Sequence, residues 1–508
     1  MAEELTPENP ETPETPENPG TPAAPDSAAT AAGPETEEPV KQRKNGLYPD
    51  VSDELAENMK SGWADTELRD LEPIAQAERT AARRAALSAR FPGERLVIPA
   101  GNLKTRSNDT EYGFRASTEY AYLTGDQTED GVLVLEPKSE GHESTLYLLP
   151  RSDRENGEFW LSGQGELWVG RRHSLTEASV LYGVPTGDVR RLAGLLAEAT
   201  GPVRVVRGHD AGIEKALTDK VTGERDEELR VYLSEARLVK DDFEIAELEK
   251  ACASTARGFE DVVKVLDKAE ATSERYIEGT FFLRARVEGN DVGYGSICAA
   301  GPHACTLHWV RNDGPVRSGD LLLLDAGVET TELYTADVTR TLPISGRYTD
   351  IQRKIYDAVY EAQEAGIAAV KPGAKYRDFH DAAQRVLAEK LVEWGLLEGP
   401  VERVLELGLQ RRWTLHGTGH MLGMDVHDCA VARTETYVGG TLEPGMCLTV
   451  EPGLYFQSDD LTVPEEYRGI GVRIEDDILV TEDGNRNLSD ALPRRSDEVE
   501  AWMAALKG

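Results

Sequence analysis

The sequence predicts two folded domains, an α/β domain followed by an α+β domain with a largely antiparallel sheet. Short strand-like runs separated by turn residues follow an early helical segment, and further on helices and strands alternate in segments. The 508 residues are enough for two or three cores, and 39% hydrophobic with 29% charged residues is typical of a globular chain with some unfolded sequence. We expect the domains at residues 46–240 and 241–508.

The first 45 residues predict a disordered tail. Proline recurs at every third position from Pro7 to Pro25, which is the repeat of an extended polyproline helix. The first forty residues hold ten acidic side chains and no lysine or arginine. Such a segment buries too little apolar surface to offset the entropy of ordering. We expect a solubilising tail, with a partner-binding tail as the alternative.

The N-terminal domain opens with a segment rich in alanine, arginine and glutamate, Leu71 to Phe91, which predicts a helix. Later segments, Asp188 to Ala199 and Gly212 to Thr218, also predict helices. Four apolar runs between turn residues predict strands of a mixed sheet. These runs are ERLVIPAG around Val97, EYAYLTG around Tyr122, GVLVLEP around Leu133 and STLYLLP around Tyr147.

The second domain follows a long helical stretch, predicted over Ser234 to Val265 from its apolar spacing. Further helices are predicted over Ser273–Val287, Thr349–Val370 and Tyr376–Trp394. The Thr349 helix opens with Thr-Asp-Ile-Gln, a capping box, and a Lys-Pro-Gly sequence ends it. The strand-like segments of this domain are LLLLDAGV, LYTADVTRTLPI, GMCLTVEPGLYF and GVRIEDDILVT.

Composition excludes several classes of function. A net charge of −36 and a pI near 4.7 argue against nucleic acid and anionic membrane surfaces as partners, because both require basic patches. The five cysteines are odd in number and form no C-x-x-C pair, so we expect reduced thiols and a cytoplasmic protein. No secretory signal and no apolar run of 18 residues is visible, so no membrane span is expected.

The stretch from Trp413 to Asp428, WTLHGTGHMLGMDVHD, holds three of the nine histidines. Three glycines in the same stretch make a regular helix costly, at roughly 1 kcal/mol each against alanine. We expect an extended glycine-rich segment that brings imidazoles close to something small. Imidazole is the commonest side-chain metal ligand. The histidines alone are equally consistent with ordinary core or loop positions.

Carboxylates inside predicted strands favour a metal site over ordinary core or loop positions for these histidines. Asp325 ends an apolar run, and Asp337 follows it at a spacing that suits a hairpin. Glu451 and Glu475 lie in two later strands. Two acids 4 Å apart repel by roughly 4 kcal/mol at an effective dielectric near 20. Two divalent cations with His420 as a neutral ligand would compensate four such charges and supply hydrolytic chemistry.

The ordered motifs LLLLDAG, ADVTRT, HGTGHMLGMDVHD, LTVEPGLYF and GVRIEDD resemble the pita-bread metallopeptidases, and within them the aminopeptidase P (Xaa-Pro aminopeptidase) family. The stretch TRSNDTEYGFRASTEYAYLTG, Thr105 to Gly125, resembles the N-terminal domain of that family. The resemblance implies a C-terminal pita-bread domain with a curved sheet. It also implies release of the N-terminal residue before proline, through attack by a metal-bridging hydroxide.

The resemblance assigns the metal ligands residue by residue. They are Asp325, Asp337, His420, Glu451 and Glu475. Asp325 would hold one metal and the substrate amine would bind there, His420 and Glu451 would complete the other metal, and Asp337 with Glu475 would bridge both. Two divalent ions per chain are implied, with manganese favoured and cobalt or zinc as alternatives.

The remaining roles concern substrate. Glu451 would also handle the proton of the nucleophile. His308, on the strand preceding Asp325, and His427 match active-site histidines of the family. His416 matches a pocket histidine, Arg473 would lie near the bound peptide, and Tyr294 would lie behind the ligands. A homo-oligomer, dimer or tetramer, is implied.

Several readings stay open beside this one. Prolidase shares all five ligands and cleaves dipeptides only, but the N-terminal stretch favours aminopeptidase P. Short methionine aminopeptidases lack so large an N-terminal domain, and creatinase does without metals. A non-catalytic pita-bread binding module would have lost ligands that this chain keeps.

Overall fold

The computed structural model describes residues 51–220 and 223–507, so the predicted tail of residues 1–45 lies outside the described residues. The chain divides into two compact units. The first includes residues 51–64 and 152–171, with α1 (Asp53–Asn58), α4 (Glu158–Leu161) and α5 (Glu166–Val169). The second includes residues 65–151 and the chain from residue 172, and it contains every site residue predicted above.

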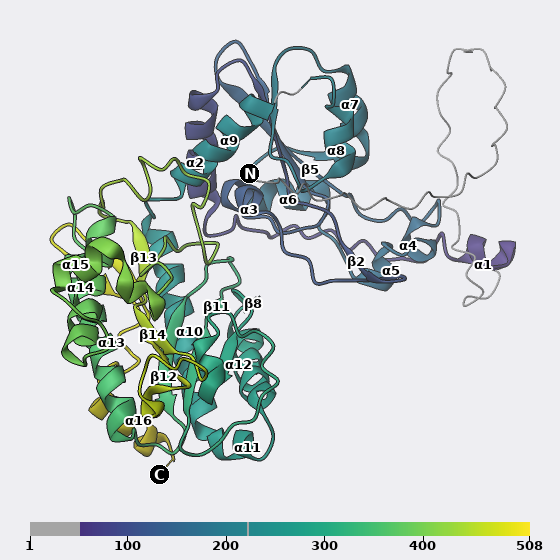
Figure 1. The fold of residues 1–508 in the computed structure, drawn as a ribbon. Coiled ribbons are helices and arrows are strands. Elements are labelled where there is room, and N and C mark those ends of the chain that lie inside the picture. The colour runs from purple at the N-terminus through teal and green to yellow at the C-terminus, as the bar shows by residue number, and fades with distance from the viewer. Residues whose placement is uncertain (1–50, 221–222, 508) are drawn as a thin grey trace, which may run out of the picture. The chain divides into compact units, whose positions relative to one another are not determined.

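A mixed sheet in the order β6-β5-β4-β1-β7 organises the earlier part of the second unit (Figure 1). Its strands are β1 (Arg95–Pro99), β4 (Val132–Pro137), β5 (His142–Leu148), β6 (Thr186–Asp188) and β7 (Val203–Val205). β1 pairs antiparallel with β4 and parallel with β7. Three of the four predicted strands, around Val97, Leu133 and Tyr147, are therefore confirmed.

Helices and a small hairpin complete this part of the unit. The hairpin consists of β2 (Thr105–Ser107) and β3 (Thr110–Glu111). The helices are α2 (Ala77–Arg90), α3 (Thr118–Thr124), α6 (Leu175–Tyr182), η1 (Val189–Arg191), α7 (Leu192–Glu198), α8 (Ala211–Ala216) and α9 (Gly223–Ala236). The first predicted helix starts later than expected, at Ala77 rather than Leu71, and Pro73 precedes it.

The prediction of a strand at EYAYLTG is wrong, because these residues form helix α3. The Ser117 hydroxyl caps the helix by accepting from the Tyr120 amide, and Gly125 ends it in the left-handed conformation at φ 74°. All of α3 except Glu119 is buried, so neither a helical nor a strand period stands out in its sequence. The caps, rather than the apolar pattern, decide the structure here.

The predicted continuous helix from Ser234 to Val265 is also wrong, because the chain breaks between α9 and α10 (Asp242–Lys264). Asp241 caps α10 and forms a capping box with Glu244. The Lys240 amide donates to the Gly445 carbonyl at 2.9 Å, so the break pairs with the later part of the chain. A strong N-terminal cap outweighs helix propensity across residues 237–241.

The strands from residue 291 onward form short sheets in which each recorded pair is antiparallel. They are β8 (Asp291–Val292), β9 (Ile297–Ala300), β10 (Leu321–Ala326), β11 (Val328–Glu329), β12 (Val338–Pro343), β13 (Cys447–Val450), β14 (Gly453–Phe456), β15 (Ile470–Arg473), β16 (Asp476–Val480) and β17 (Asn485–Asn487). The predicted hairpin of β10 and β12 is confirmed, with Asp325 opposite Thr339. Its second strand begins only at Val338, because Leu333 takes a left-handed φ of 66° and interrupts the extended run.

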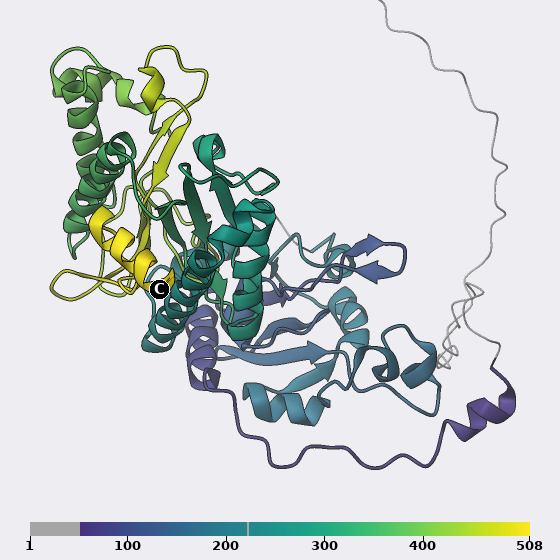
Figure 2. The ribbon, with the colours of Figure 1, turned by 90° about the horizontal axis from the view of Figure 1, so that it is seen from below.

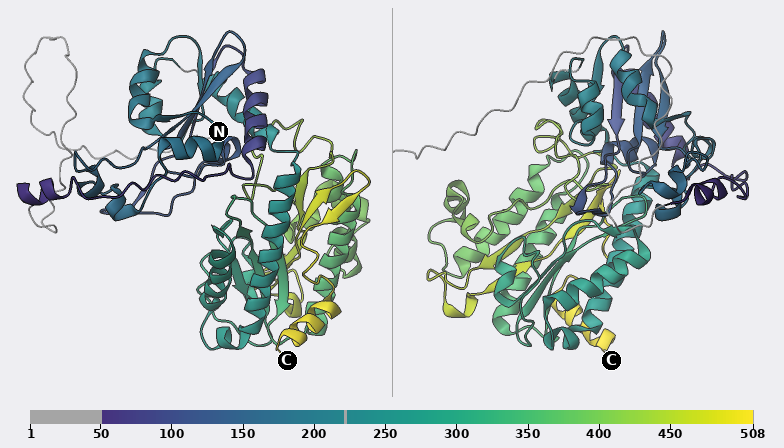
Figure 3. Two further views of the ribbon diagram at one scale, coloured as in Figure 1. Left: turned by 180° about the vertical axis from the view of Figure 1, so that it is seen from behind. Right: turned by 90° about the vertical axis from the view of Figure 1, so that its right-hand side faces the viewer.

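The helices of this part pack against these strands (Figures 2 and 3). They are α11 (Leu266–Glu270), α12 (Glu274–Glu288), η2 (Gly301–Cys305), α13 (Asp350–Ala369), α14 (Arg377–Glu393), α15 (Val401–Leu407), η3 (Leu409–Arg412), η4 (Glu465–Tyr467) and α16 (Ser496–Lys507). α13 lies beside α14 and contacts β13, β14 and β15, while α12 contacts β8 and β9. The predicted capping box of Thr349 and Gln352 is present at α13.

Two apolar cores join these helices to the strands that carry the predicted ligands. In one, Phe259 and Phe281 from α10 and α12 meet edge to face at 6.0 Å in a cluster with Leu324 of β10. In the other, Leu448 and Val450 of β13 cluster with Phe379 of α14. These cores fix the strand ends from which the acids project. Among the described helices, none is both long and apolar enough to cross a membrane.

Candidate metal centre

The predicted metal ligands converge from separate segments of the chain. Asp325 lies near the end of β10, Asp337 directly before β12, Glu451 directly after β13, and Glu475 between β15 and β16. Ligand atoms of Asp337, His420 and Glu475 lie within 4.8 Å of one another. His420 Nε2 is 3.3 Å from Asp337 Oδ2 and 3.6 Å from Glu451 Oε1. Asp337, Glu451 and Glu475 therefore lie around the imidazole of His420, and Asp325 is linked to Asp337 through the Tyr294 hydroxyl.

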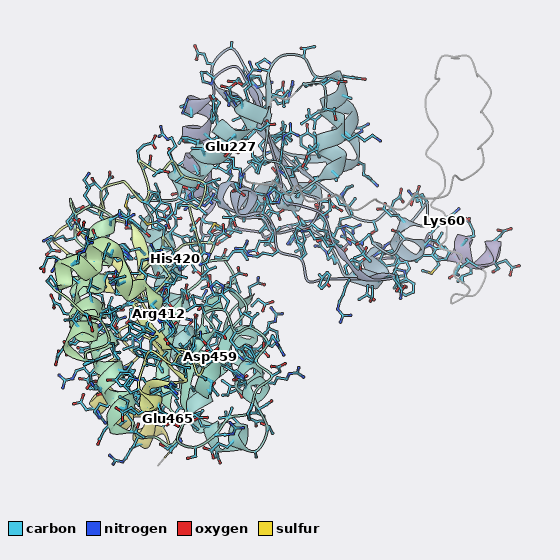
Figure 4. The ribbon with its side chains drawn as sticks, viewed as in Figure 1. Lys60, Glu227, Arg412, His420, Asp459 and Glu465 are labelled. Atoms are coloured by element: carbon cyan, nitrogen blue, oxygen red, sulfur yellow. The ribbon has the colours of Figure 1, made fainter. Side chains whose placement is uncertain are left out.

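The segment that carries His420 (labelled in Figure 4) pairs with β13 through backbone hydrogen bonds. The Thr449 amide donates to the His420 carbonyl and the Glu451 amide to the Thr418 carbonyl, both at 2.8 Å. A Cβ on Gly419 would lie 2.0 Å from the Thr449 carbonyl oxygen, so only glycine permits this approach. The predicted extended glycine-rich segment is thus confirmed.

The ring of His420 is oriented for ligation. Its Nδ1 lies 3.2 Å from the Met421 carbonyl oxygen, which can only accept a hydrogen bond. With Nδ1 protonated, loss of the proton from Nε2 would leave a lone pair that faces the acids and is available to a cation. Such a backbone partner commonly fixes the tautomer of a metal-binding histidine.

Other polar side chains hold the acids. The Tyr294 hydroxyl lies 2.6 Å from Asp325 Oδ1 and 2.5 Å from Asp337 Oδ1. The Thr339 hydroxyl donates to Glu475 Oε2 at 2.6 Å. Because a phenol has one proton, the double contact of Tyr294 requires one of its two partners to be protonated when no cation is present.

Crowding and burial change the protonation of these groups. Burial raises the pKa of Asp325 and Glu475, and raises that of Glu451 to about 7, with neighbouring acids adding to each rise. Burial lowers the pKa of His420, but the hydrogen bond to Asp337 and the charge of Glu451 outweigh burial and raise it to about 9. Without cations, the cluster therefore holds protons in place of the missing positive charge.

Arg473 lies beneath the ligands rather than at the surface, with 4% of its area exposed. Its Nη2 is 2.5 Å from Asp325 Oδ2, and its Nη1 donates to the Tyr455 hydroxyl at 3.0 Å. That hydroxyl lies 2.8 Å from His416 Nε2. Burial lowers the pKa of His416 to about 4, and the charge of Arg473 adds to this effect. His416 is therefore neutral, with Nδ1 donating to the Gly417 carbonyl at 2.6 Å.

His308 and His427 border the same cluster from two loops, and both are exposed. The ring of His427 meets that of His420 edge-on at 4.4 Å. Burial lowers the pKa of His427, and the charges of His420 and His308 add to the effect. The prediction that His308 lies on a strand is wrong, because it occupies a turn after η2.

A buried carboxylate anchors the loop that bears His308. Glu274 is fully buried and accepts from the Ala300 and Gly314 amides at 2.8 and 2.7 Å. It also lies 2.8 Å from His303 Nδ1 and accepts from Trp309 Nε1 at 2.8 Å. The rings of His303 and Trp309 stack at 3.9 Å, so the residues that flank His308 are fixed from below.

Thr339 and Tyr455 take part in the site but were not predicted. Tyr455 lies two and four residues beyond Gly453 and Glu451, so a strand period would have placed all three on one face. Thr339 lies two residues beyond Asp337, so the same period would have placed these two side chains on one face. The signal was present in the sequence for both residues, but apolar context alone does not separate a site tyrosine from a core tyrosine.

Two cavities open beside the cluster. One of about 690 Å³ is lined by residues that include Arg115, Thr118, Asp425 and His427. The other, of about 1250 Å³, is lined by residues of α14 and by the chain from Thr414 to Gly419, including His416. Both cavities reach a predicted substrate histidine, so the site has room for a ligand larger than a metal ion.

The donor set fits divalent cations. Carboxylate oxygens with one imidazole suit hard to borderline metals. Arg473 alone cannot neutralise four crowded acids, and the raised pKa values of Asp325, Glu451 and Glu475 indicate that the cluster lacks positive charge. Added cations would satisfy this demand without any change in the fold.

Comparison with known proteins agrees with this centre. Residues 246–482 match metallopeptidase family M24, and residues 80–204 match the aminopeptidase P N-terminal domain. The chain is 84% identical over 508 residues to Xaa-Pro aminopeptidase 1 of Streptomyces coelicolor, covering 100% of both chains. It is 33% identical to the Xaa-Pro aminopeptidase of Escherichia coli over 452 residues, which cover 85% of this chain and 99% of the relative.

Solved structures show the same similarity. Pseudomonas aeruginosa aminopeptidase PepP superposes with a TM-score of 0.76 at 32% identity, covering 86% of this chain and 100% of that chain. Zinc-substituted E. coli aminopeptidase P in complex with product gives a TM-score of 0.77 at 32% identity, with the same coverage.

Proposed function

The chain belongs to metallopeptidase family M24 and carries the aminopeptidase P N-terminal domain, and from this we propose a metal-dependent aminopeptidase that releases the N-terminal residue from peptides with proline in second position. The chain thus combines an N-terminal domain with a pita-bread C-terminal domain, for which we keep residues 46–240 and 241–508 as our proposed boundaries. The convergence of Asp337, His420 and Glu475 within 4.8 Å is the observation that carries the proposal.

We propose that this centre holds two divalent cations. Asp325, Asp337, His420, Glu451 and Glu475 would be the ligands. When bound, the cations would supply a water activated at neutral pH and a Lewis acid for the scissile carbonyl. Manganese is our preferred metal, with cobalt or zinc as alternatives, and one solved relative is zinc-substituted.

The protein's own groups then perform defined tasks. Glu451 is placed to take and return the proton of the nucleophile, because its carboxylate lies at the centre, 3.6 Å from His420 Nε2. His427 and His308, exposed at the rim, can donate to the scissile carbonyl as negative charge develops on its oxygen. The neutral ring of His416 and the hydroxyl of Tyr455 offer a wall for the proline ring.

Arg473 acts from beneath this wall. We infer that its guanidinium orients Asp325 and Tyr455, both of which it contacts directly, and that any effect on the peptide passes through them. A cleft selective for proline must not require a hydrogen bond from the nitrogen after the scissile carbonyl, because proline lacks that N–H.

The decisive experiment is turnover of an X-Pro-X tripeptide by metal-depleted protein with manganese, cobalt and zinc added in turn. We expect cleavage of the X-Pro bond to depend on the added metal, and an X-Ala-X peptide to be cleaved poorly. Cleavage of X-Pro dipeptides but not tripeptides would identify a prolidase instead. Fewer than one metal per chain after reconstitution, with no cleavage, would identify a binding module.

Two further proposals concern the assembly and the location of the protein. We propose a homo-oligomer, a dimer or tetramer, and a reducing compartment such as the cytoplasm. The five cysteines support the second inference, because all are free and buried.

A further inference from the structure

The motif from Thr105 to Gly125 has no role in the function proposed above, yet its side chains reach the loop that carries His427. We propose that Arg115, Thr118 and the linker residue Arg237 are positioning residues that hold the segment Met424–Asp428 and thereby aim His427 at the substrate. The inference rests on the proposed peptidase activity.

The N-terminal side of His427 is held by two residues of the motif. Thr118 Oγ1 donates to Asp425 Oδ1 at 2.6 Å, and Arg115 Nη2 donates to the Met424 carbonyl at 2.8 Å. Arg115 Nε also donates to Glu329 at 2.7 Å, where the carboxylate is only 3% exposed. The bond to Glu329 thus fixes the guanidinium that also contacts the segment Met424–Asp428.

The C-terminal side of His427 is held by the linker between α9 and α10. Arg237 Nε donates to Asp428 Oδ1 at 2.9 Å, and the two residues are 3% and 1% exposed. Arg237 also lies 3.6 Å from Glu119 of the motif. The segment is therefore held on both sides of the histidine, and the Arg237–Asp428 pair on the C-terminal side is shielded from water.

The imidazole itself has no comparable tie. Within residues 51–220 and 223–507, no group forms a hydrogen bond with the His427 ring, which contacts the ring of His420 edge-on at 4.4 Å. The position of the ring therefore depends on the backbone of residues 424–428. A displacement of about 1 Å of a reacting group can lower the rate on the order of 100-fold. We therefore expect loss of these contacts to slow catalysis.

Arg115 and Thr118 also line the cavity of about 690 Å³ beside His427. Direct contact with substrate would therefore be an alternative to positioning. The two roles differ in their kinetics. A group that binds substrate equally in ground and transition states changes KM, whereas misplacement of a group that acts in the transition state lowers kcat.

The test is Thr118→Val, which removes the hydroxyl and keeps the shape of the side chain. The matched control is Thr128→Val, which removes a hydrogen bond of equal length, 2.6 Å to Asp126, away from the His427 segment. With an X-Pro-X tripeptide we expect Thr118→Val to lower kcat by about tenfold or more at unchanged KM, because the hydroxyl both donates to Asp425 and accepts from Arg115 Nη1 at 3.2 Å. Thr118→Ser should restore the rate.

The coupling to His427 is tested by repeating the change in the His427→Ala background. We expect no further loss of kcat there, because the positioned group is gone. Asp425→Ala removes the same bond from the other side and should behave like Thr118→Val, which covers poor folding of either variant. An equal loss in both backgrounds, or a change in KM alone, would overturn the proposal.

Amide hydrogen exchange gives a readout that does not depend on turnover. Exchange of residues 424–428 should accelerate in Thr118→Val and stay unchanged in Thr128→Val. Unchanged exchange in Thr118→Val would also overturn the proposal. Accelerated exchange in a protein that cleaves no X-Pro peptide would refute the peptidase function and leave the positioning contacts established.

Discussion

Loading of the proposed centre with cations should release protons, and their number can be worked out from the structure. At pH 7, His420 with a pKa of about 9 is almost fully protonated, and Glu451 with a pKa of about 7 is about half protonated. Burial and the neighbouring acids raise the pKa of Glu475 as well, so any proton it holds adds to these two contributions. Because metal ligands must lose their protons, we expect release of at least about 1.5 protons per chain, one from His420 and half from Glu451.

Titration calorimetry with manganese at pH 7, in buffers of different ionisation enthalpy, measures this number directly. Protons compete with the cations, so the apparent affinity should rise with pH. Glu451→Gln should release about half a proton fewer at pH 7, since the missing carboxyl is half protonated there. Release of fewer than about one proton by the unchanged protein would refute the reasoning, because the acids would then be ionised without cations.

The same titration affects the stability of metal-depleted protein. Burial raises the pKa of Glu451 from 4.5 to about 7, so its contribution to stability is fully present below pH 4.5 and is lost as pH rises through 7. The loss amounts to roughly 3 kcal/mol in the free energy of unfolding. Urea unfolding in the presence of a chelator should show this decrease, and manganese should oppose it.

Three further predictions concern single substitutions. Asp337→Ala should abolish turnover of X-Pro-X peptides, by at least about 1000-fold, with little change in melting temperature, and near-normal rates would remove its role as ligand. Gly419→Ala should destabilise the protein by about 3 kcal/mol in urea unfolding because of its backbone clash, whereas Gly417→Ala, whose Cβ meets nothing closer than 3.9 Å, should be nearly neutral. Glu274→Gln should lower kcat about tenfold by loosening the anchored loop, and an undiminished loss in a His308→Ala background would argue against action through that histidine.

The clustering of acids could be predicted because buried charge is conspicuous in a sequence, and the role of these acids as metal ligands stays a proposal. Asp325 and Glu451 follow runs of leucine or β-branched residues, and such positions demand compensation wherever the strands meet. The capping box at Thr349 was equally readable, since it depends on residues three apart. Both features are local, and neither requires knowledge of the strand register.

The remaining features depend on contacts between distant residues. Helix α3 could not be distinguished from a strand because it is buried on nearly every side, and the break before α10 depends on a cap whose strength competes with helix propensity. The contact of Arg473 with Asp325 and Tyr455 requires the pairing of β14 with β15, where Gly453 lies opposite Arg473. Sequence alone placed Arg473 beside the peptide, and that role stays a prediction.

The backbone pairing of the His420 segment with β13 has a consequence for redesign. The imidazole of His420 and the carboxylate of Glu451 are chemically different donors that lie on two paired backbone segments. Amide hydrogen bonds between the segments set the distance between them, and the two side chains do not. An exchange of the imidazole for a carboxylate or a thiol would therefore alter which ion the hollow prefers without shifting the opposite donor. The ion selectivity of the site could therefore be changed by substitution of single ligand side chains.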